Sequence, residues 1–270
     1  MKIEKLNIGL FLLAILLFAS CEKVIQVDIS QKEEVLVVDA VISTLPNQSI
    51  IRLSKTKPLF EKAEYVQVSQ AEVIIKSNTG EVFLMEETDD GMYQNPNLIG
   101  REGVEYRLEV NWEGYRIEAK SEMPYTVPID SLEIVVSQRG FSGNDETSYS
   151  LKVHFSDPGN MDNYYRFDVF NNDSLYSGFI VSNDLYYDGL QTYQFLRNQD
   201  IHALDSITVQ ISSIDQVNYS YFSVLRQSGS PFNIAPGNPN TNIKGKAVGY
   251  FGAYAQNRKS ILIRQMEPPF

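Results

Sequence analysis

The stretch YRLEVNWEGYRIEAK, residues 106–120, decides the fold class of this 270-residue chain. Apolar Tyr106, Leu108 and Val110 alternate with polar residues, and the same alternation resumes after a Glu-Gly dipeptide. Period-two alternation on both sides of a two-residue turn is typical of an antiparallel hairpin with one apolar and one charged face. The stretch therefore predicts a half-exposed β-hairpin that rests on a hydrophobic core.

Extended patterns recur along the chain, and 16 Tyr and 14 Phe residues also favour β structure. The glycines of residues 245–252 indicate an edge strand with bulges or a close backbone approach. The other strands are expected at residues 25–29, 35–42, 51–53, 71–76, 81–86, 132–136, 149–155, 165–169, 207–211 and 261–264.

Prolines at positions 124 and 128 disfavour both strand and helix, so we place a domain boundary there. Residues 21–123 are predicted to form an immunoglobulin-like β-sandwich, because six or seven short strands follow at close spacing. Residues 124–130 form a linker, and residues 131–270 form a β-rich C-terminal domain. The predicted fold is therefore all-β, with two tandem β-sandwich domains, of which the second contains one short helix.

The helix is predicted near residues 215–227. Its buried face is expected to carry Val217, Tyr221, Val224 and Leu225, which recur at helical spacing. A capping box formed by Ser213 and Gln216 is predicted to begin the helix, and Gly229 suits its C-terminal end.

The N-terminus has the pattern of a processing signal. Lys2 and Lys5 precede an apolar run at residues 8–18, which is too short to span a bilayer. The run ends in Phe18-Ala19-Ser20-Cys21, which resembles the lipobox of Gram-negative lipoproteins. Residues 1–20 are therefore predicted to be a signal peptide, and Cys21 is predicted to carry diacylglycerol and a further acyl chain such as palmitate. A triacylated cysteine is sufficient for stable membrane anchoring.

Composition excludes several classes of function. The net charge of −11 argues against a nucleic-acid binder, which needs a basic face for phosphates. Cys21 is the single cysteine, so the chain can form no intramolecular disulfide and no thiolate metal cluster. His154 and His202 are the two histidines, and neither has a partner at metal-ligand spacing. No phosphate-binding loop is present. We therefore predict neither an enzyme nor a bound cofactor or metal.

One acidic turn leaves an alternative open. Asp157, Asn160 and Asp162 could offer oxygen atoms to a hard cation such as Ca²⁺, although the segment lacks the spacing of a full calcium-binding loop. A solvated turn is the other interpretation, and the sequence favours it.

Tyrosines are dense in residues 183–193, which have Gly189 near their centre. Tyr186, Tyr187 and Tyr193 are the candidate recognition residues, because tyrosine supplies a large contact area at low entropic cost. Protein interfaces and sugar stacking both use such side chains.

The order of several short segments resembles the family called domain of unknown function 4249. They are LVVDA at 36–40, FSDP at 155–158, NYYRF at 163–167, NIKG at 242–245 and GYFG at 249–252. The resemblance implies an outer-membrane lipoprotein, on the periplasmic or the cell-surface face, often encoded beside a TonB-dependent transporter and without established catalytic residues. The leading hypothesis is an accessory protein that docks on an outer-membrane β-barrel. The alternative is a solute-binding lipoprotein that captures a glycan or peptide through aromatic loops.

Overall fold

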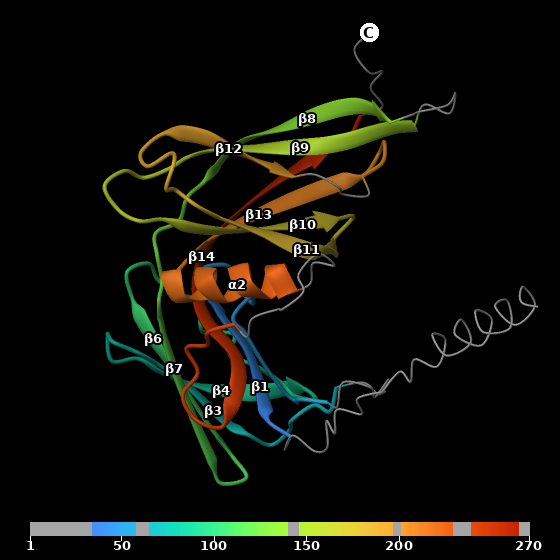
Figure 1. Ribbon diagram of the computed structural model, residues 1–270. Helices are drawn as coiled ribbons and strands as arrows, with labels where there is room; N and C mark the ends of the chain where they lie inside the picture. Colours follow the sequence, from blue (N-terminus) through green and yellow to red (C-terminus); the bar gives the residue numbers. More distant parts are fainter. Residues whose placement is uncertain (1–33, 58–64, 140–145, 197–200, 229–238, 265–270) are drawn as a thin grey trace, which may run out of the picture. The chain divides into compact units, whose positions relative to one another are not determined.

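The computed structural model describes residues 34–57, 65–139, 146–196, 201–228 and 239–264. These residues form fourteen strands and one helix, which confirms the predicted all-β class with a short helix (Figure 1). The signal peptide, Cys21 and the strand expected at residues 25–29 lie outside the described residues, so processing, lipidation and this strand stay predictions. In the described part, no helix has the length and hydrophobicity needed to cross a bilayer.

The strands fall into two sheets. The larger has eleven strands in the order β11-β10-β13-β14-β1-β2-β5-β4-β3-β6-β7, and the smaller has the order β12-β9-β8. The strands of the first half are β1 (Leu36–Ser43), β2 (Ile50–Lys55), β3 (Glu72–Ser77), β4 (Val82–Asp89), β5 (Met92–Gln94), β6 (Glu105–Trp112) and β7 (Tyr115–Glu122). Those of the second half are β8 (Ile129–Arg139), β9 (Glu146–Ser156), β10 (Tyr164–Asn171), β11 (Ser174–Asn183), β12 (Gln191–Leu196), β13 (Ser206–Ile214) and β14 (Ala247–Leu262).

The predicted hairpin is formed by β6 and β7, with Trp112 paired to Tyr115 across the Glu113-Gly114 turn. On its apolar face Val110 and Ile117 are fully buried, whereas Tyr115, next to the turn, is 39% exposed. The period-two pattern therefore predicted both the hairpin and the face that packs on the core.

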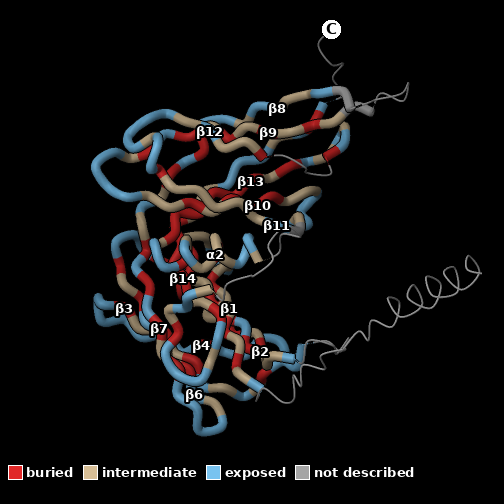
Figure 2. The backbone as a smooth tube through the Cα atoms, viewed as in Figure 1, coloured by how far each residue is buried: buried red, intermediate tan, exposed pale blue. Residues whose placement is uncertain are grey.

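Buried residues, red in Figure 2, form three hydrophobic clusters, of which two are large and the third is a small one around Phe222. The first contains buried residues of β1, β2, β3, β6, β7 and β14. The second lies between the smaller sheet, which contributes Val153 and Phe155 of β9, and the larger sheet, which contributes Phe167 of β10 and Val209 of β13. Burying an apolar face of each sheet against the other gives the second half its sandwich-like character.

Strand β14 corrects the expectation for the glycine-rich segment. Residues 247–252 belong to β14, which lies between β13 and β1 and is therefore no edge strand, and residues 261–262 are the end of the same strand rather than part of a separate one. Its first half pairs in parallel with β1, and its second half pairs antiparallel with β13. Gly249 allows this arrangement: its φ is +108°, and a Cβ there would lie 2.0 Å from the carbonyl oxygen of Val38.

The division into domains at residues 124–130 stays a prediction. These residues run between β7 and β8. Because β14 follows the proposed boundary in sequence but pairs with β1 before it, the two halves share one continuous sheet.

The helix, α2 (Gln216–Ser228), lies where it was predicted, but its cap and its buried face differ from the prediction. Ser213 is still part of β13, and Asp215 caps the helix by accepting a hydrogen bond of 2.7 Å from the backbone N–H of Asn218. The buried positions of the helix are Asn218 and Phe222, whereas the predicted Val217 and Leu225 are exposed.

Two contacts explain the helix orientation. The Asn218 amide donates a hydrogen bond of 3.0 Å to the carbonyl of Phe251 on β14, so a polar residue occupies the buried face at no loss of hydrogen bonding. The guanidinium of Arg166 lies 4.5 Å from the ring centroids of both Phe179 and Phe222. Cation–π contacts of this kind hold Phe222 against the sheet.

Candidate recognition site

The loop between β11 and β12, residues 184–190, is a compact series of turns. The backbone N–H of Tyr187 donates to the carbonyl of Asp184 at 2.7 Å, and that of Leu190 donates to the carbonyl of Tyr187 at 2.9 Å. Consecutive hydrogen bonds of this kind give the loop a defined conformation of its own.

A buried carboxylate holds the loop against the turn that follows β9. Asp157 is only 6% exposed, and its two oxygens accept hydrogen bonds from the Tyr165 hydroxyl and from the backbone N–H of Gly189, the latter at 3.0 Å. Burial raises the pKa of Asp157, and the nearby charges of Asp184 and Asp188 raise it further. Asp157 therefore serves as a hydrogen-bonded clamp between two segments that are about thirty residues apart.

Two more carboxylates join the same segments. Asp184 accepts a hydrogen bond of 2.7 Å from the backbone N–H of Asn163, and Asp188 accepts one of 3.0 Å from the backbone N–H of Asn160. Together with the clamp, these bonds fix both ends of loop 184–190.

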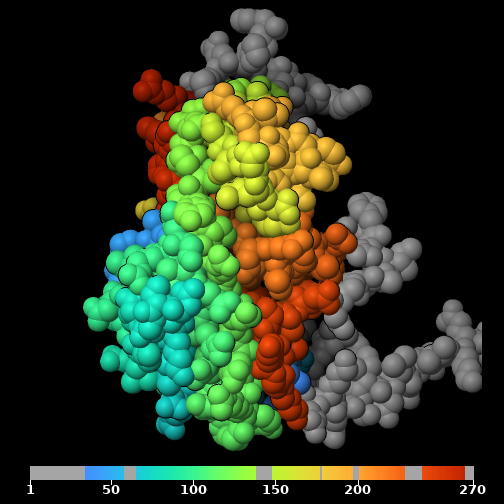
Figure 3. Space-filling view, turned by 90° about the vertical axis from the view of Figure 1, so that its left-hand side faces the viewer, coloured from blue at the N-terminus to red at the C-terminus, as the bar shows by residue number. Residues whose placement is uncertain are grey.

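Two glycines allow loop 184–190 to lie close to the turn that follows β9. A Cβ at Gly159 would lie 3.1 Å from the Cα of Gly189, and a Cβ at Gly189 would lie equally close to Gly159. Gly189 also has a φ of +70°, a conformation that other residues adopt at a cost. The two segments lie side by side on the surface, as the yellow and golden residues near 160 and 190 show in Figure 3.

The structure places the three predicted tyrosines in different surroundings. Tyr186 is 89% exposed. Tyr187 instead packs its ring edge against Phe155, at a centroid distance of 6.1 Å, and its hydroxyl bonds to that of Ser182 at 2.8 Å. Burial raises the pKa of Tyr187 to about 12. Tyr193 lies on β12 rather than in the loop and is 54% exposed. Of the three, Tyr186 is therefore the residue that the loop presents to solvent.

Apolar neighbours accompany Tyr186. Leu185 is 70% exposed and Leu190 is 58% exposed, while Met161 of the adjoining turn is 47% exposed. Grouped apolar side chains at a surface mark interaction sites more often than single ones do. The sequence analysis did not single out these three residues, because an exposed Leu or Met in a loop has no pattern that distinguishes it from a buried one.

An acidic hollow of about 420 Å³ adjoins the loop and includes Asp162, Asp184 and Asp188 in its lining. Carboxylate oxygens of Asp157, Asp184 and Asp188 lie within 4.8 Å of one another, so these three residues could surround a hard cation. Cation binding by Asp157, Asn160 and Asp162 stays a prediction. Both oxygens of Asp157 already accept hydrogen bonds, which agrees with a structural role for this carboxylate.

Neither histidine is part of that cluster. The Nε2 atom of His154 lies 2.9 Å from a carboxylate oxygen of Glu133, and the His154 ring lies 5.7 Å from that of Tyr193. The Nδ1 atom of His202 lies 3.8 Å from Asp205. As predicted, His154 lies on the face of β9 opposite the buried Val153 and Phe155.

The fold and the site define a β-sandwich-type protein with an exposed loop that is held by hydrogen bonds and presents Tyr186 to solvent. The chain belongs to the family described as domain of unknown function (DUF4249), whose family model matches residues 22–260. A search of curated proteins found no match.

Twelve chains of solved structures match, among them the chicken interferon gamma receptor alpha chain in its selenomethionine form. That structure is 6% identical, with a TM-score of 0.19, and the match covers 67% of this chain and 89% of that chain. A likeness at this TM-score carries no information about function.

Proposed function

We propose that this protein is a lipid-anchored interaction protein of the outer membrane that docks on a β-barrel partner, such as a TonB-dependent transporter, through loop 184–190. The observation that carries docking is the 89% exposure of Tyr186 on a loop whose ends are held by partly buried hydrogen bonds. The lipobox that ends at Cys21 supports the anchor.

The rigidity of the loop favours binding. Association loses free energy when side chains and loops must be ordered, and here the Asp157 clamp has already ordered the loop in the free protein. A few buried aromatic residues usually contribute most of the energy of an interface, and Tyr186 with Leu185 suits that role. An anchored protein also meets a membrane partner at high effective concentration.

The surroundings of the loop specify the chemistry of the partner. Asp162 and Asp188 are exposed near the apolar tip, and the whole chain has a net charge of −11. Complementarity then requires an apolar recess with a basic rim on the partner. Docking is therefore expected to weaken as salt concentration rises, because the charges on the rim are screened.

Affinity purification from detergent-solubilised membranes tests the proposal. The full chain is expected to recover a β-barrel protein, and the double variant Leu185→Ser with Tyr186→Ala is expected to recover at least about tenfold less, since each hot-spot side chain contributes more than about 1 kcal/mol. Tyr125→Ala is the matched control, because Tyr125 is also exposed, at 58%, but lies outside the loop.

Wild-type recovery by the double variant would show that loop 184–190 is not the docking surface. If the wild type recovered no partner and were instead stabilised against heat by a glycan or a peptide, the alternative of solute capture would replace docking.

A further inference from the structure

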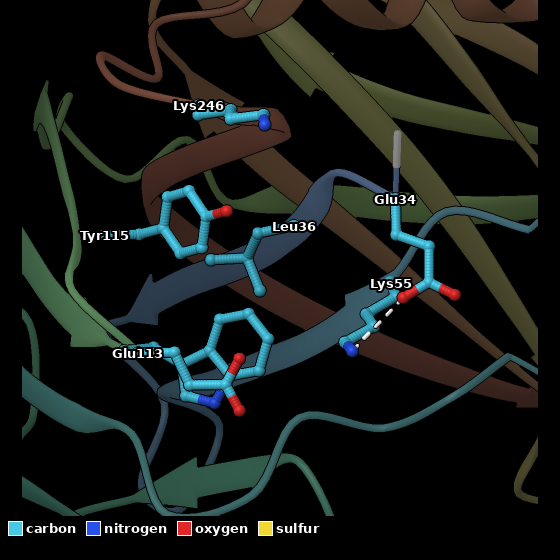
Figure 4. Close-up of a pocket in the computed structure, with 7 residues that line it drawn as sticks. Glu34, Leu36, Lys55, Glu113, Tyr115 and Lys246 are labelled. Carbon is cyan, nitrogen blue, oxygen red and sulfur yellow. Dashed lines mark ion pairs between the residues drawn. The ribbon is translucent and has the colours of Figure 1, made fainter. Parts of the chain in front are cut away.

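A second hollow, of about 190 Å³, lies where the tip of the β6–β7 hairpin meets β1 and β2 (Figure 4). It is lined by Glu34, Leu36, Lys55, Trp112, Glu113, Tyr115 and Lys246. None of these residues belongs to loop 184–190 or to its supports.

Two aromatic rings, together with Leu36, form the apolar part of the lining. Trp112 and Tyr115 are directly paired across the hairpin turn, and their rings are stacked with centroids 6.1 Å apart and an interplanar angle of 21°. Trp112 packs against the first hydrophobic cluster, whereas Tyr115 is 39% exposed. Packing against the core therefore orients the pair, and part of the aromatic surface faces solvent.

Two lysines complete the aromatic wall. The Nζ atom of Lys55 lies 5.2 Å from the Trp112 ring centroid, and that of Lys246 lies 5.6 Å from the Tyr115 ring centroid. In Figure 4, Tyr115 and Lys246 lie on one side of the hollow, and Glu34 and Lys55 lie on the other. Each ammonium group thus lies over one of the two rings, and the aromatic surface that faces solvent is the exposed part of Tyr115.

The charges in the lining balance. Lys55 forms an ion pair of 3.2 Å with Glu34, and the lining contains one further lysine and one further glutamate. A cationic ligand would be repelled by the lysines, and an anionic ligand would be repelled by the glutamates. A charged ligand therefore gains little electrostatic binding energy. A hydroxyl group can accept a hydrogen bond from an ammonium group and donate one to a carboxylate, so it matches both partners.

We infer that this pocket binds one ring of a neutral saccharide, with C–H groups of the sugar against the exposed part of Tyr115, close to Trp112, and its hydroxyls toward the lysines and glutamates. The volume agrees with a single ring, because pockets for larger ligands usually measure about 300–1,000 Å³. The ring would be an end unit or a branch of a longer glycan. This inference does not rest on the docking loop, and either can fail without the other.

Tryptophan fluorescence provides a local assay, because Trp112 is the single tryptophan of the chain. The full chain is kept in lauryldimethylamine oxide, a detergent without a sugar head group, and is titrated with maltohexaose, cellohexaose or chitohexaose. At least one of these neutral hexamers is expected to change the Trp112 emission in a saturable manner. A hexamer of galacturonic acid is the charged comparison and is expected to bind more weakly.

Variants assign the response to the pocket. Tyr115→Ala is expected to weaken binding about tenfold in isothermal titration, which corresponds to the loss of about 1.4 kcal/mol. Tyr125→Ala, at another exposed tyrosine, should leave the affinity unchanged. Lys246→Ala removes an exposed side chain of the lining and is the second test variant in case Tyr115→Ala disturbs the hairpin.

Three results would overturn the inference. The first is the absence of a saturable change with every neutral hexamer. The second is binding that Tyr115→Ala and Lys246→Ala leave intact, which would place the ligand elsewhere. The third is a change in Trp112 emission that occurs only with phosphatidylglycerol vesicles, which would make the aromatic pair a membrane contact instead of a sugar site.

Discussion

Replacing Asp157 with alanine should loosen loop 184–190 and destabilise the whole fold. The carboxylate is 6% exposed and accepts hydrogen bonds from the Tyr165 hydroxyl and the Gly189 backbone N–H. In Asp157→Ala both donors lose their partner. The Tyr165 hydroxyl is buried, and a buried donor without a partner costs about 1–3 kcal/mol, whereas the N–H of the exposed Gly189 can bond to water at a smaller cost. Part of this cost is offset, because the variant no longer buries a carboxylate whose pKa is already raised by burial.

The expected net loss is about 2–3 kcal/mol in the free energy of unfolding. For a chain of this size, 1 kcal/mol shifts the melting temperature by about 2–4 °C, so a decrease of about 5–10 °C is expected by circular dichroism. Amide hydrogen exchange supplies the local measurement: the Gly189 N–H should exchange faster in Asp157→Ala. The exposed Asp162→Ala is the control and should change stability by less than about 0.5 kcal/mol.

The conservative variant Asp157→Asn separates hydrogen bonding from charge. The asparagine amide keeps an acceptor for one of the two donors, so the loss should be smaller than with alanine. The pKa of Asp157 is higher in the folded state, so its carboxyl group binds a proton more tightly in the native protein than in the unfolded chain. Wild-type stability should therefore fall as the pH rises from the ordinary aspartate pKa through the folded value, and Asp157→Asn should lack this component.

A double-mutant cycle with Tyr165→Phe measures the clamp directly. A coupling energy of about 1–2 kcal/mol between positions 157 and 165 is expected, because the two side chains share a buried hydrogen bond. If Asp157→Ala melted like Asp162→Ala and Gly189 exchanged at its wild-type rate, the loop would not be held by this carboxylate.

Three further predictions concern the anchor and the sheet. Radiolabelled palmitate should enter the wild-type chain but not Cys21→Ser, which should accumulate as an unprocessed precursor; label in the variant would disprove anchoring at Cys21. A fragment of residues 21–123 should not unfold cooperatively by circular dichroism, because it lacks β14 and leaves the pairing edge of β1 exposed, and co-expression of residues 124–270 should restore a cooperative transition. Gly249→Ala should cost about 3 kcal/mol or more, since its Cβ would meet the Val38 carbonyl, whereas Gly80→Ala, with a similar φ of +94° but open space, should cost less in a denaturant titration.

Local patterns predicted local structure well. The β6–β7 hairpin, the face of β9 on which His154 lies and the position of α2 all follow from alternation, turn residues or helical spacing. The central position of β14 in the sheet could not be predicted from local patterns. Its pairing with β1 joins segments about 210 residues apart, and local sequence periodicity contains no information about such a contact. A glycine-rich strand resembles an edge strand in sequence, and only the neighbouring Val38 carbonyl explains Gly249.

The role of residues 183–193 in recognition stays a prediction. The density of tyrosines selected this segment, but it could not separate the exposed Tyr186 from Tyr187, which contacts Phe155. Adjacent residues in a turn point in directions that depend on turn geometry rather than on a regular period. The Asp157 clamp was likewise hidden, because its partner Gly189 is 32 residues away in the chain. The buried face of the helix was predicted wrongly, because hydrophobicity alone does not indicate that the polar Asn218 lies on it.

Photo-crosslinking in living cells tests the central claim most directly, because it reports contact at a single position without extraction. A photoreactive phenylalanine analogue replaces Tyr186, and the same analogue at the exposed Tyr125 is the control. Docking through loop 184–190 predicts one crosslinked product between position 186 and an outer-membrane β-barrel, and none of that product from position 125. Equal crosslinking from both positions, or no crosslink to a β-barrel from position 186, would contradict docking through this loop.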